Sequence, residues 1–262
     1  MPLASSALGC PGAREAGWSR AGGPTDCRRV GHKLHDWLEL NSKPSGDTRI
    51  NISLSQALNT DPADLPLDLS LRQAVVALVF WHDAGRTHLC LGRRAIHPDD
   101  PWSGDLAFPG GKAETIDATL HAVAARETCE EIGLHLPRDA LVGRMEQFNA
   151  GGARKPTTVW PLIYELAEPP DQFTLSDEMS DAFWAPLDEL WNPRMWIAFS
   201  FPPTRAQRAG ITIGNHFLWG FSLHVLIELS ERLGYPLNAI RALETHPHID
   251  CVEADTLPDW QS

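Results

Sequence analysis

The stretch that decides the fold reads Phe108-Pro109-Gly110-Gly111-Lys112 and continues to Arg126-Glu127-Thr128-Cys129-Glu130-Glu131-Ile132-Gly133-Leu134. It predicts a glycine-rich turn that leads into a helix over residues 118–132, which Gly133 ends. In such a helix Glu127, Glu130 and Glu131 share one face, because their spacing is i, i+3 and i+4. Carboxylates this close repel one another unless a cation lies between them. Oxygen ligands at this density suit Mg²⁺ or Mn²⁺.

Composition and charge narrow the classes of protein that the chain can belong to. A hydrophobic fraction of 43% over 262 residues is typical of a globular protein with a substantial core. The formal net charge of −12 argues against a nucleic-acid partner, because a phosphate backbone needs a basic surface. We therefore expect a small-molecule partner. The oligomeric state is left open, with a homodimer among the alternatives.

The cysteines and the apolar runs indicate the cellular compartment of the protein. The five cysteines are scattered and form no C-x-x-C pair, so the sequence predicts neither a disulfide framework nor a zinc site. The sequence has no run of about 18 apolar residues, so it predicts no membrane span. The N-terminus lacks the apolar segment of a secretory signal. We expect a cytoplasmic protein.

The hydrophobic pattern divides the chain into three parts. We expect a disordered or loosely packed leader over residues 1–45, a catalytic domain over 46–235 and a C-terminal tail over 236–262. Residues 73–81 are almost wholly apolar, which predicts a strand covered on both faces. Further strands are expected over 87–93, 104–108, 140–149, 157–165 and 182–185, a helical turn over 187–190, a loop-rich stretch over 193–210, and an amphipathic helix over 219–233. Mixed strands with two main helices indicate an α+β fold.

The stretch from Phe108 to Leu134 resembles the signature of the Nudix hydrolases. That signature is a glycine, five residues, an acid, about seven residues, and then Arg-Glu-aliphatic-x-Glu-Glu-x-Gly-aliphatic. The matching residues are Gly111, Arg126, Glu127, Glu130, Glu131, Gly133 and Leu134. Asp117 stands at the first acid, one residue further from Arg126 than usual, and Thr128 replaces an aliphatic residue. The resemblance implies the Nudix fold, an α/β/α sandwich with a mixed sheet packed between helices.

Within that family, the chain looks most like the branch that cleaves coenzyme A into 3′,5′-ADP and 4′-phosphopantetheine. The longer spacing, the Phe-Pro-Gly-Gly lead-in, Trp184-Ala-Pro-Leu187 and Trp219-Gly-Phe221 carry this resemblance. Members of the branch usually have Leu-Arg-x-His-x-Gly-Glu-Val upstream. Here Gly104 matches, Asp105 replaces the glutamate, Trp102 stands in the histidine position and the arginine is missing. Other nucleotides (ADP-ribose, NADH or a nucleoside triphosphate) and a non-catalytic nucleotide-binding module are the alternatives.

The resemblance also implies roles for the residues of the acidic helix. Glu127, Glu130 and Glu131 are the expected metal ligands, and the carbonyl of Gly111 is a further one. Arg126 lies four residues before Glu130, so its guanidinium can pair with a carboxylate and hold its orientation. A solvated acidic helix face is the alternative, and the glycine turn together with Arg126 favours the metal site.

Three residues outside this stretch complete the expected site. A general base or extra ligand often comes from a later loop in the family, and Glu178 is the candidate here, with a plain surface acid as the alternative. Arg93 and Arg94 end a strand before the glycine turn. Either can bind a phosphate through two hydrogen bonds, or both simply form a solvated strand end.

Overall fold

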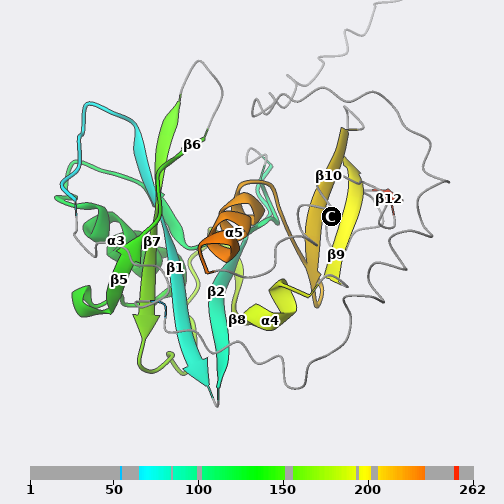
Figure 1. Cartoon of the computed structure of the whole chain (residues 1–262). Helices are drawn as coiled ribbons and strands as arrows, with labels where there is room; N and C mark the ends of the chain where they lie inside the picture. Colours follow the sequence, from blue (N-terminus) through cyan, green and yellow to red (C-terminus); the bar gives the residue numbers. More distant parts are fainter. Residues whose placement is uncertain are drawn as a thin grey trace, which may run out of the picture.

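The computed structural model describes residues 54, 65–83, 85–98, 102–150, 156–192, 195–201, 206–233 and 251–253 (Figure 1). The predicted leader over 1–45 lies outside the described residues, as does most of the predicted tail over 236–262. The three-part division of the chain therefore stays a prediction.

A mixed sheet of eight strands forms the centre of the molecule. Its strands are β1 (Gln73–Asp83), β2 (Arg86–Arg94), β3 (Leu106–Ala107), β4 (Gly110–Lys112), β5 (Leu141–Arg144), β6 (Phe148–Ala150), β7 (Thr157–Leu166) and β8 (Met179–Pro186). Their order is β3-β2-β1-β7-β5, with β4 beside β1, β6 beside β7 and β8 beside β2. β1 is parallel to β7 and antiparallel to β2 and β4.

Helix α3 (Leu120–Ile132) covers one face of this sheet (Figure 1). Successive residues of a strand point to opposite faces, so Val75, Ala77 and Val79 of β1 all point toward α3. They form one core with Leu120 and Val123 of the helix, and all five side chains are buried. This packing places the acidic helix flat against the central strand.

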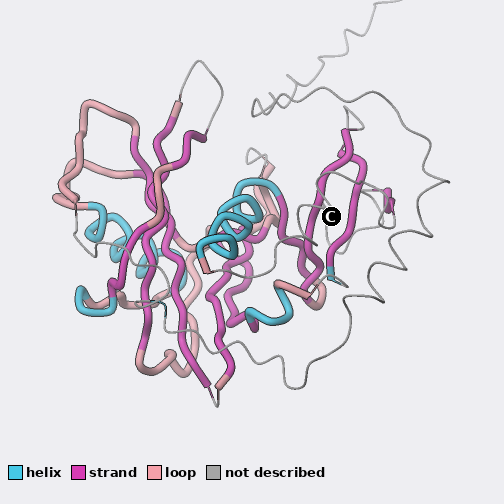
Figure 2. Tube along the Cα trace, viewed as in Figure 1, coloured by secondary structure: helices cyan, strands magenta, loops and turns pink. Residues whose placement is uncertain are grey.

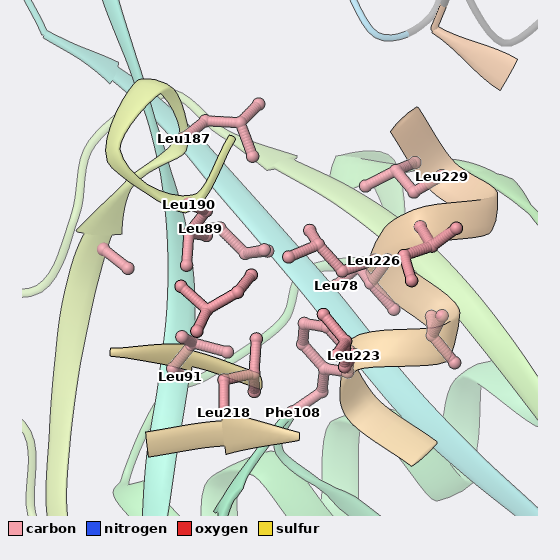
Figure 3. Packing of buried hydrophobic residues seen from close by; sticks show 14 of the residues in the cluster. Leu78, Leu89, Leu91, Phe108, Leu187, Leu190, Leu218, Leu223, Leu226 and Leu229 are labelled. Atoms are coloured by element: carbon pink, nitrogen blue, oxygen red, sulfur yellow. The ribbon is translucent and has the colours of Figure 1, made fainter. Parts of the chain in front are cut away.

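Helix α5 (Gly220–Arg232) covers the opposite face. Leu223 and Leu226 of α5 point toward Leu78 and Leu89 of the sheet (Figure 3). The predicted α+β sandwich, with a mixed sheet between helices and a central strand buried on both faces, is confirmed. Among the described residues, no helix has the length and apolarity needed to cross a membrane.

A second sheet lies beyond α5, and the sequence pattern did not predict it (Figure 2). Its strands are β9 (Trp196–Phe201), β10 (Ala206–Ile213), β11 (His216–Trp219) and β12 (Cys251–Glu253), in the order β11-β10-β9-β12. The prediction of a loop-rich stretch over 193–210 was wrong, and β12 lies inside the predicted tail. Side chains of this sheet are buried in one core with α5, a contact that the local sequence pattern does not show. Pro202 and Pro203 also made the stretch look like a loop, because proline is rare inside strands.

Two other elements differ in detail from the predictions. The strand predicted over 140–149 is interrupted, with β5 and β6 both pairing with β7. A short 3₁₀ turn, η1 (Arg138–Ala140), precedes β5. The helical turn α4 (Leu187–Leu190) lies where it was predicted.

Candidate active site

The glycine turn lies directly against the acidic helix because neither of its glycines has a side chain. Gly110 has φ +148°, and a Cβ on it would collide with the backbone of Val75 and Val76. A Cβ on Gly111 would overlap the carboxylate of Glu127. Gly110 therefore lets the turn lie against β1, and Gly111 lets it lie against the half-buried carboxylate of Glu127.

Both ends of α3 carry local signals that determine its bounds. The hydroxyl of Thr119 accepts a hydrogen bond from the N–H of Ala122 at 3.2 Å and so caps the first turn. Gly133 ends the helix in the left-handed conformation, with φ +69°. These ends fix which side chains point inward. Glu131 is among them, with only 7% of its surface exposed.

Glu131 is the most perturbed acid of the site. Burial raises the pKa of its carboxyl group to about 7, although a hydrogen bond from the N–H of Gly110 at 2.8 Å favours the ionised form. The charges of Glu127 and Glu178 raise this pKa further, and the charge of Arg94 lowers it. The fold thus brings residues from α3, from the end of β2 and from the turn before β8 around one carboxylate.

Arg126 holds the outer carboxylates in place. Its Nη1 atom lies 3.0 Å from Glu127 and 3.0 Å from Glu130, while Nε and Nη2 form a bidentate pair with Asp117 at 3.1 and 2.9 Å. Nη2 also donates to the carbonyl of Lys112 at 3.0 Å, which ties the helix to β4. Burial opposes ionisation of Asp117, but its hydrogen bonds from Arg126 and from the N–H of Glu114 outweigh it and hold the pKa of Asp117 below its usual value.

Glu178 reaches the site because its turn is fastened to the end of α3. The N–H groups of Thr174 and Ser176 donate to the carbonyls of Ile132 and Glu131 at 3.0 and 2.9 Å, which satisfies the open end of the helix. The hydroxyl of Ser176 then accepts a hydrogen bond from the N–H of Glu178 at 3.3 Å. The sequence analysis missed Ser176, although a serine two residues before the bonded N–H is a recognised turn pattern.

The two candidate arginines have different surroundings. The charge of Arg94 acts on Glu131, and its backbone N–H donates to the carbonyl of Asp105 at 3.1 Å. The Nε of Arg93 donates to the carbonyl of Gly104 at 3.3 Å. The strand pairing with β8 shifts register between these two residues. The charge of Arg94 thus acts on the acidic cluster, which makes it the better-supported of the two candidates.

Whether these residues fit a divalent ion depends on the carboxylates. Within the part of the chain that the structure describes, no three acidic, histidine or cysteine side chains converge as a ready-made metal cluster. Glu130 is turned to Arg126 and its side chain is 60% exposed. Burial nevertheless raises the pKa of Glu127 as well as that of Glu131, and neighbouring carboxylate charges add to both shifts, which is the strain that a hard cation relieves. The surroundings of Glu127 and Glu131 fit such an ion, and the metal-ligand roles of Glu127, Glu130, Glu131 and the Gly111 carbonyl all stay predictions.

The chain resembles several known proteins. A Nudix hydrolase, NudL, of Salmonella paratyphi B is 29% identical over 150 residues, which cover 56% of this chain and 75% of that protein. The MutT/nudix family protein from Enterococcus faecalis is 17% identical, with a TM-score of 0.46 over 71% of this chain and 68% of its own. The NUDIX domain of Shewanella oneidensis NrtR, solved with ADP ribose, is 17% identical, with a TM-score of 0.45 over 64% and 94%.

A family model, that of the NUDIX domain, matches residues 71–206. This range includes the glycine turn, α3 and the turn that carries Glu178, and it spans just over half of the 262 residues. The chain therefore belongs to the NUDIX domain family and is a Nudix hydrolase.

Proposed function

We propose that this Nudix hydrolase cleaves the diphosphate bond of coenzyme A or an acyl-coenzyme A with the help of Mg²⁺ or Mn²⁺. The products are 3′,5′-ADP and 4′-phosphopantetheine or its acyl derivative. The observation that carries the reaction class is the buried Glu131, held against the N–H of Gly110 and surrounded by the charges of Glu127, Glu178 and Arg94.

Each residue of the site has a task in this proposal. Glu127 and Glu131 hold the divalent ion, which when bound neutralises charge on the phosphate oxygens and makes water a better nucleophile. Arg126 keeps Glu127 and Glu130 from turning away. Glu178 receives the proton of the attacking water. Arg94 pairs with a phosphate oxygen of the substrate.

Support for coenzyme A comes from the sequence around the site. The Phe-Pro-Gly-Gly lead-in ends at Gly111, and the long spacing to Arg126 belongs to the same pattern. Trp102, with 62% of its surface exposed, stands where that pattern has a histidine. This difference favours a second candidate, another nucleoside diphosphate such as ADP-ribose, because an exposed indole offers a stacking surface to many groups.

A substrate panel tests the proposal. The full chain is incubated with Mg²⁺ or Mn²⁺ and, separately, with coenzyme A, acetyl-coenzyme A, ADP-ribose, NADH and ATP, and the products are identified by mass spectrometry. We expect the two coenzyme A compounds to be cleaved fastest. Cleavage of ADP-ribose with intact coenzyme A would overturn the substrate assignment but not the reaction class.

The variant Glu131→Gln tests the reaction class itself. We expect it to lose activity by roughly 100-fold or more, because a neutral amide is a poor ligand for a hard cation. Glu146→Gln is the matched control, since it makes the same change at an exposed acid between β5 and β6. Equal activity of these two variants would refute the role of Glu131.

A further inference from the structure

Strand β11 contacts the large sheet through polar groups at both of its ends. At its first residue, Nε2 of His216 lies 3.0 Å from Oδ2 of Asp181. At its last residue, Nε1 of Trp219 donates to Oδ1 of Asp105 at 2.8 Å. β11 lies outside the residues that match the family model, which end at 206.

Both contacts end on residues that pair with the two arginines of β2. Asp181 of β8 lies opposite Arg93 in the strand register. The carbonyl of Asp105 accepts the backbone N–H of Arg94 at 3.1 Å. A four-residue strand from the second sheet is thus joined, on either side of β2, to the neighbours of Arg93 and Arg94.

The middle of β11 is anchored in the core, so its ends are held firmly. Leu218 is fully buried, and in Figure 3 it lies in the same part of the core as Leu91 and Phe108. The ring of His216 stacks on Phe183 of β8 with centroids 4.8 Å apart and an angle of 17°. A strand held in this way can transmit the position of the second sheet to the end of β2.

We infer that Trp219 and His216 are positioning residues that keep Arg94, and with it the end of β2, in place for a substrate diphosphate. This inference rests on the proposed function, in which Arg94 binds a phosphate oxygen. Trp219 and His216 each act through an aspartate that flanks the arginines.

The variant Trp219→Phe tests the inference, because it keeps most of the aromatic surface and removes only the N–H donor. We expect KM for the cleaved substrate to rise by about tenfold while kcat changes by less than about threefold, since one hydrogen bond to a charged group is lost at a distance from the chemistry. The matched control is Trp196→Phe. Trp196 lies in β9 of the same sheet as Trp219, and its indole N–H donates to the carbonyl of Leu190 in α4 at 3.1 Å. This control should lower the melting temperature and leave KM unchanged.

A double-mutant cycle shows whether Trp219 acts through Arg94. In an Arg94→Gln background, Trp219→Phe should raise KM by less than about twofold, because the group it positions is gone. Asp105→Asn keeps an acceptor oxygen and should retain a near-normal KM, whereas Asp105→Leu should reproduce the effect of Trp219→Phe. Additive effects on KM, or equal behaviour of Trp219→Phe and Trp196→Phe, would overturn the inference.

A binding measurement separates failure of this inference from failure of the proposed function. Inorganic diphosphate is titrated calorimetrically into the full chain in the presence of Mg²⁺. If none of the panel compounds is cleaved but Trp219→Phe weakens diphosphate binding by about tenfold, the positioning role of Trp219 is supported and the proposed function fails. If a panel compound is cleaved and Trp219→Phe changes neither KM nor diphosphate binding, the positioning role is refuted and the proposed function stands. A wild-type chain that binds no diphosphate overturns the positioning role.

Discussion

At the scale of single residues, ionisation of the buried carboxyl group of Glu131 is unfavourable in the folded protein. Its carboxyl group ionises with a pKa raised from 4.5 to about 7 because it is buried among other acids. A carboxyl whose pKa is raised by folding stabilises the folded state below its unfolded pKa, and this stability is lost as the pH rises through the folded value. The metal-free protein should therefore lose stability between about pH 4.5 and pH 7.

The variant Glu131→Gln should remove this pH dependence in the metal-free protein. The amide oxygen can still accept the N–H of Gly110, and no buried charge remains. At about pH 8 we expect the variant to have the higher free energy of unfolding, by about 3 kcal/mol at most, and near pH 4.5 the two proteins should be equal. Denaturant unfolding in a chelator at both pH values measures this difference.

The same unfolding experiment with a divalent ion present should give the opposite order of stability gains. Adding Mn²⁺ should stabilise the wild-type chain more than Glu131→Gln, because only the former keeps the ligand charge. A stability difference that is the same at both pH values and unaffected by Mn²⁺ would contradict the assigned burial and role of Glu131.

The second prediction at this scale concerns Gly111, where there is no room for a side chain beside Glu127. Gly111→Ala places a Cβ where the carboxylate of Glu127 lies, so we expect activity to fall by about 100-fold and the Mn²⁺ requirement to rise. Gly85→Ala is the control. Gly85 has φ +84° with open space around its Cβ position, so it should cost about 1 kcal/mol of stability and little activity. Activity assays over a Mn²⁺ series distinguish the two, and equal losses would contradict the role of the glycine turn.

At the scale of elements, the turn before β8 closes the end of α3 and so holds Glu178 beside the candidate site. Ser176→Ala removes the hydroxyl that accepts the N–H of Glu178. We expect kcat to fall by about fivefold, and to fall no further when the change is made in a Glu178→Gln chain, because the hydroxyl acts by orienting that glutamate. Steady-state kinetics on the four chains checks this.

Ser70→Ala is the matched control for that turn. Ser70 is also an exposed serine whose hydroxyl bonds a residue two positions away, Asp68. It should leave kcat within about twofold of the wild type. Additive losses in the double variant of Ser176 and Glu178 would show that the serine has some other effect.

At the scale of the whole molecule, the large sheet separates two apolar cores, and among the described residues those of α3 belong to the core on one face. Leu226 of α5 is 1% exposed in the core on the opposite face. Leu226→Ala should cost about 2–5 kcal/mol, which corresponds to a fall in melting temperature of about 4–15 °C. The kcat of the folded fraction should be nearly unchanged, because Glu131 and Arg126 lie on the other side of the sheet. Leu69→Ala, at a residue 53% exposed, is the control and should change the melting temperature little.

Much of the fold followed from the pattern of the sequence. The apolar run of residues 73–81 predicted the central strand, and Gly133 predicted the end of α3 at Ile132, as observed. The start of α3 was placed two residues too early, because Thr119 is the cap of the helix, which begins at Leu120. The second sheet was not predicted, because its side chains are buried against α5. The alternation of apolar and polar residues along each strand does not reveal such a contact.

The candidate site divides in the same way. The sequence by itself indicated the reaction class, because Gly111, Arg126, Glu127 and Glu131 lie within 21 residues in the spacing of the Nudix signature, and helix geometry alone brings the acids to one face. Only the tertiary structure decided that Glu131 is buried while Glu130 is exposed, that the charges of Glu178 and Arg94 act on Glu131, and that Trp219 contacts Asp105. These contacts join residues between 37 and 114 positions apart, so they depend on strand pairing and on burial against two cores, which local spacing does not encode.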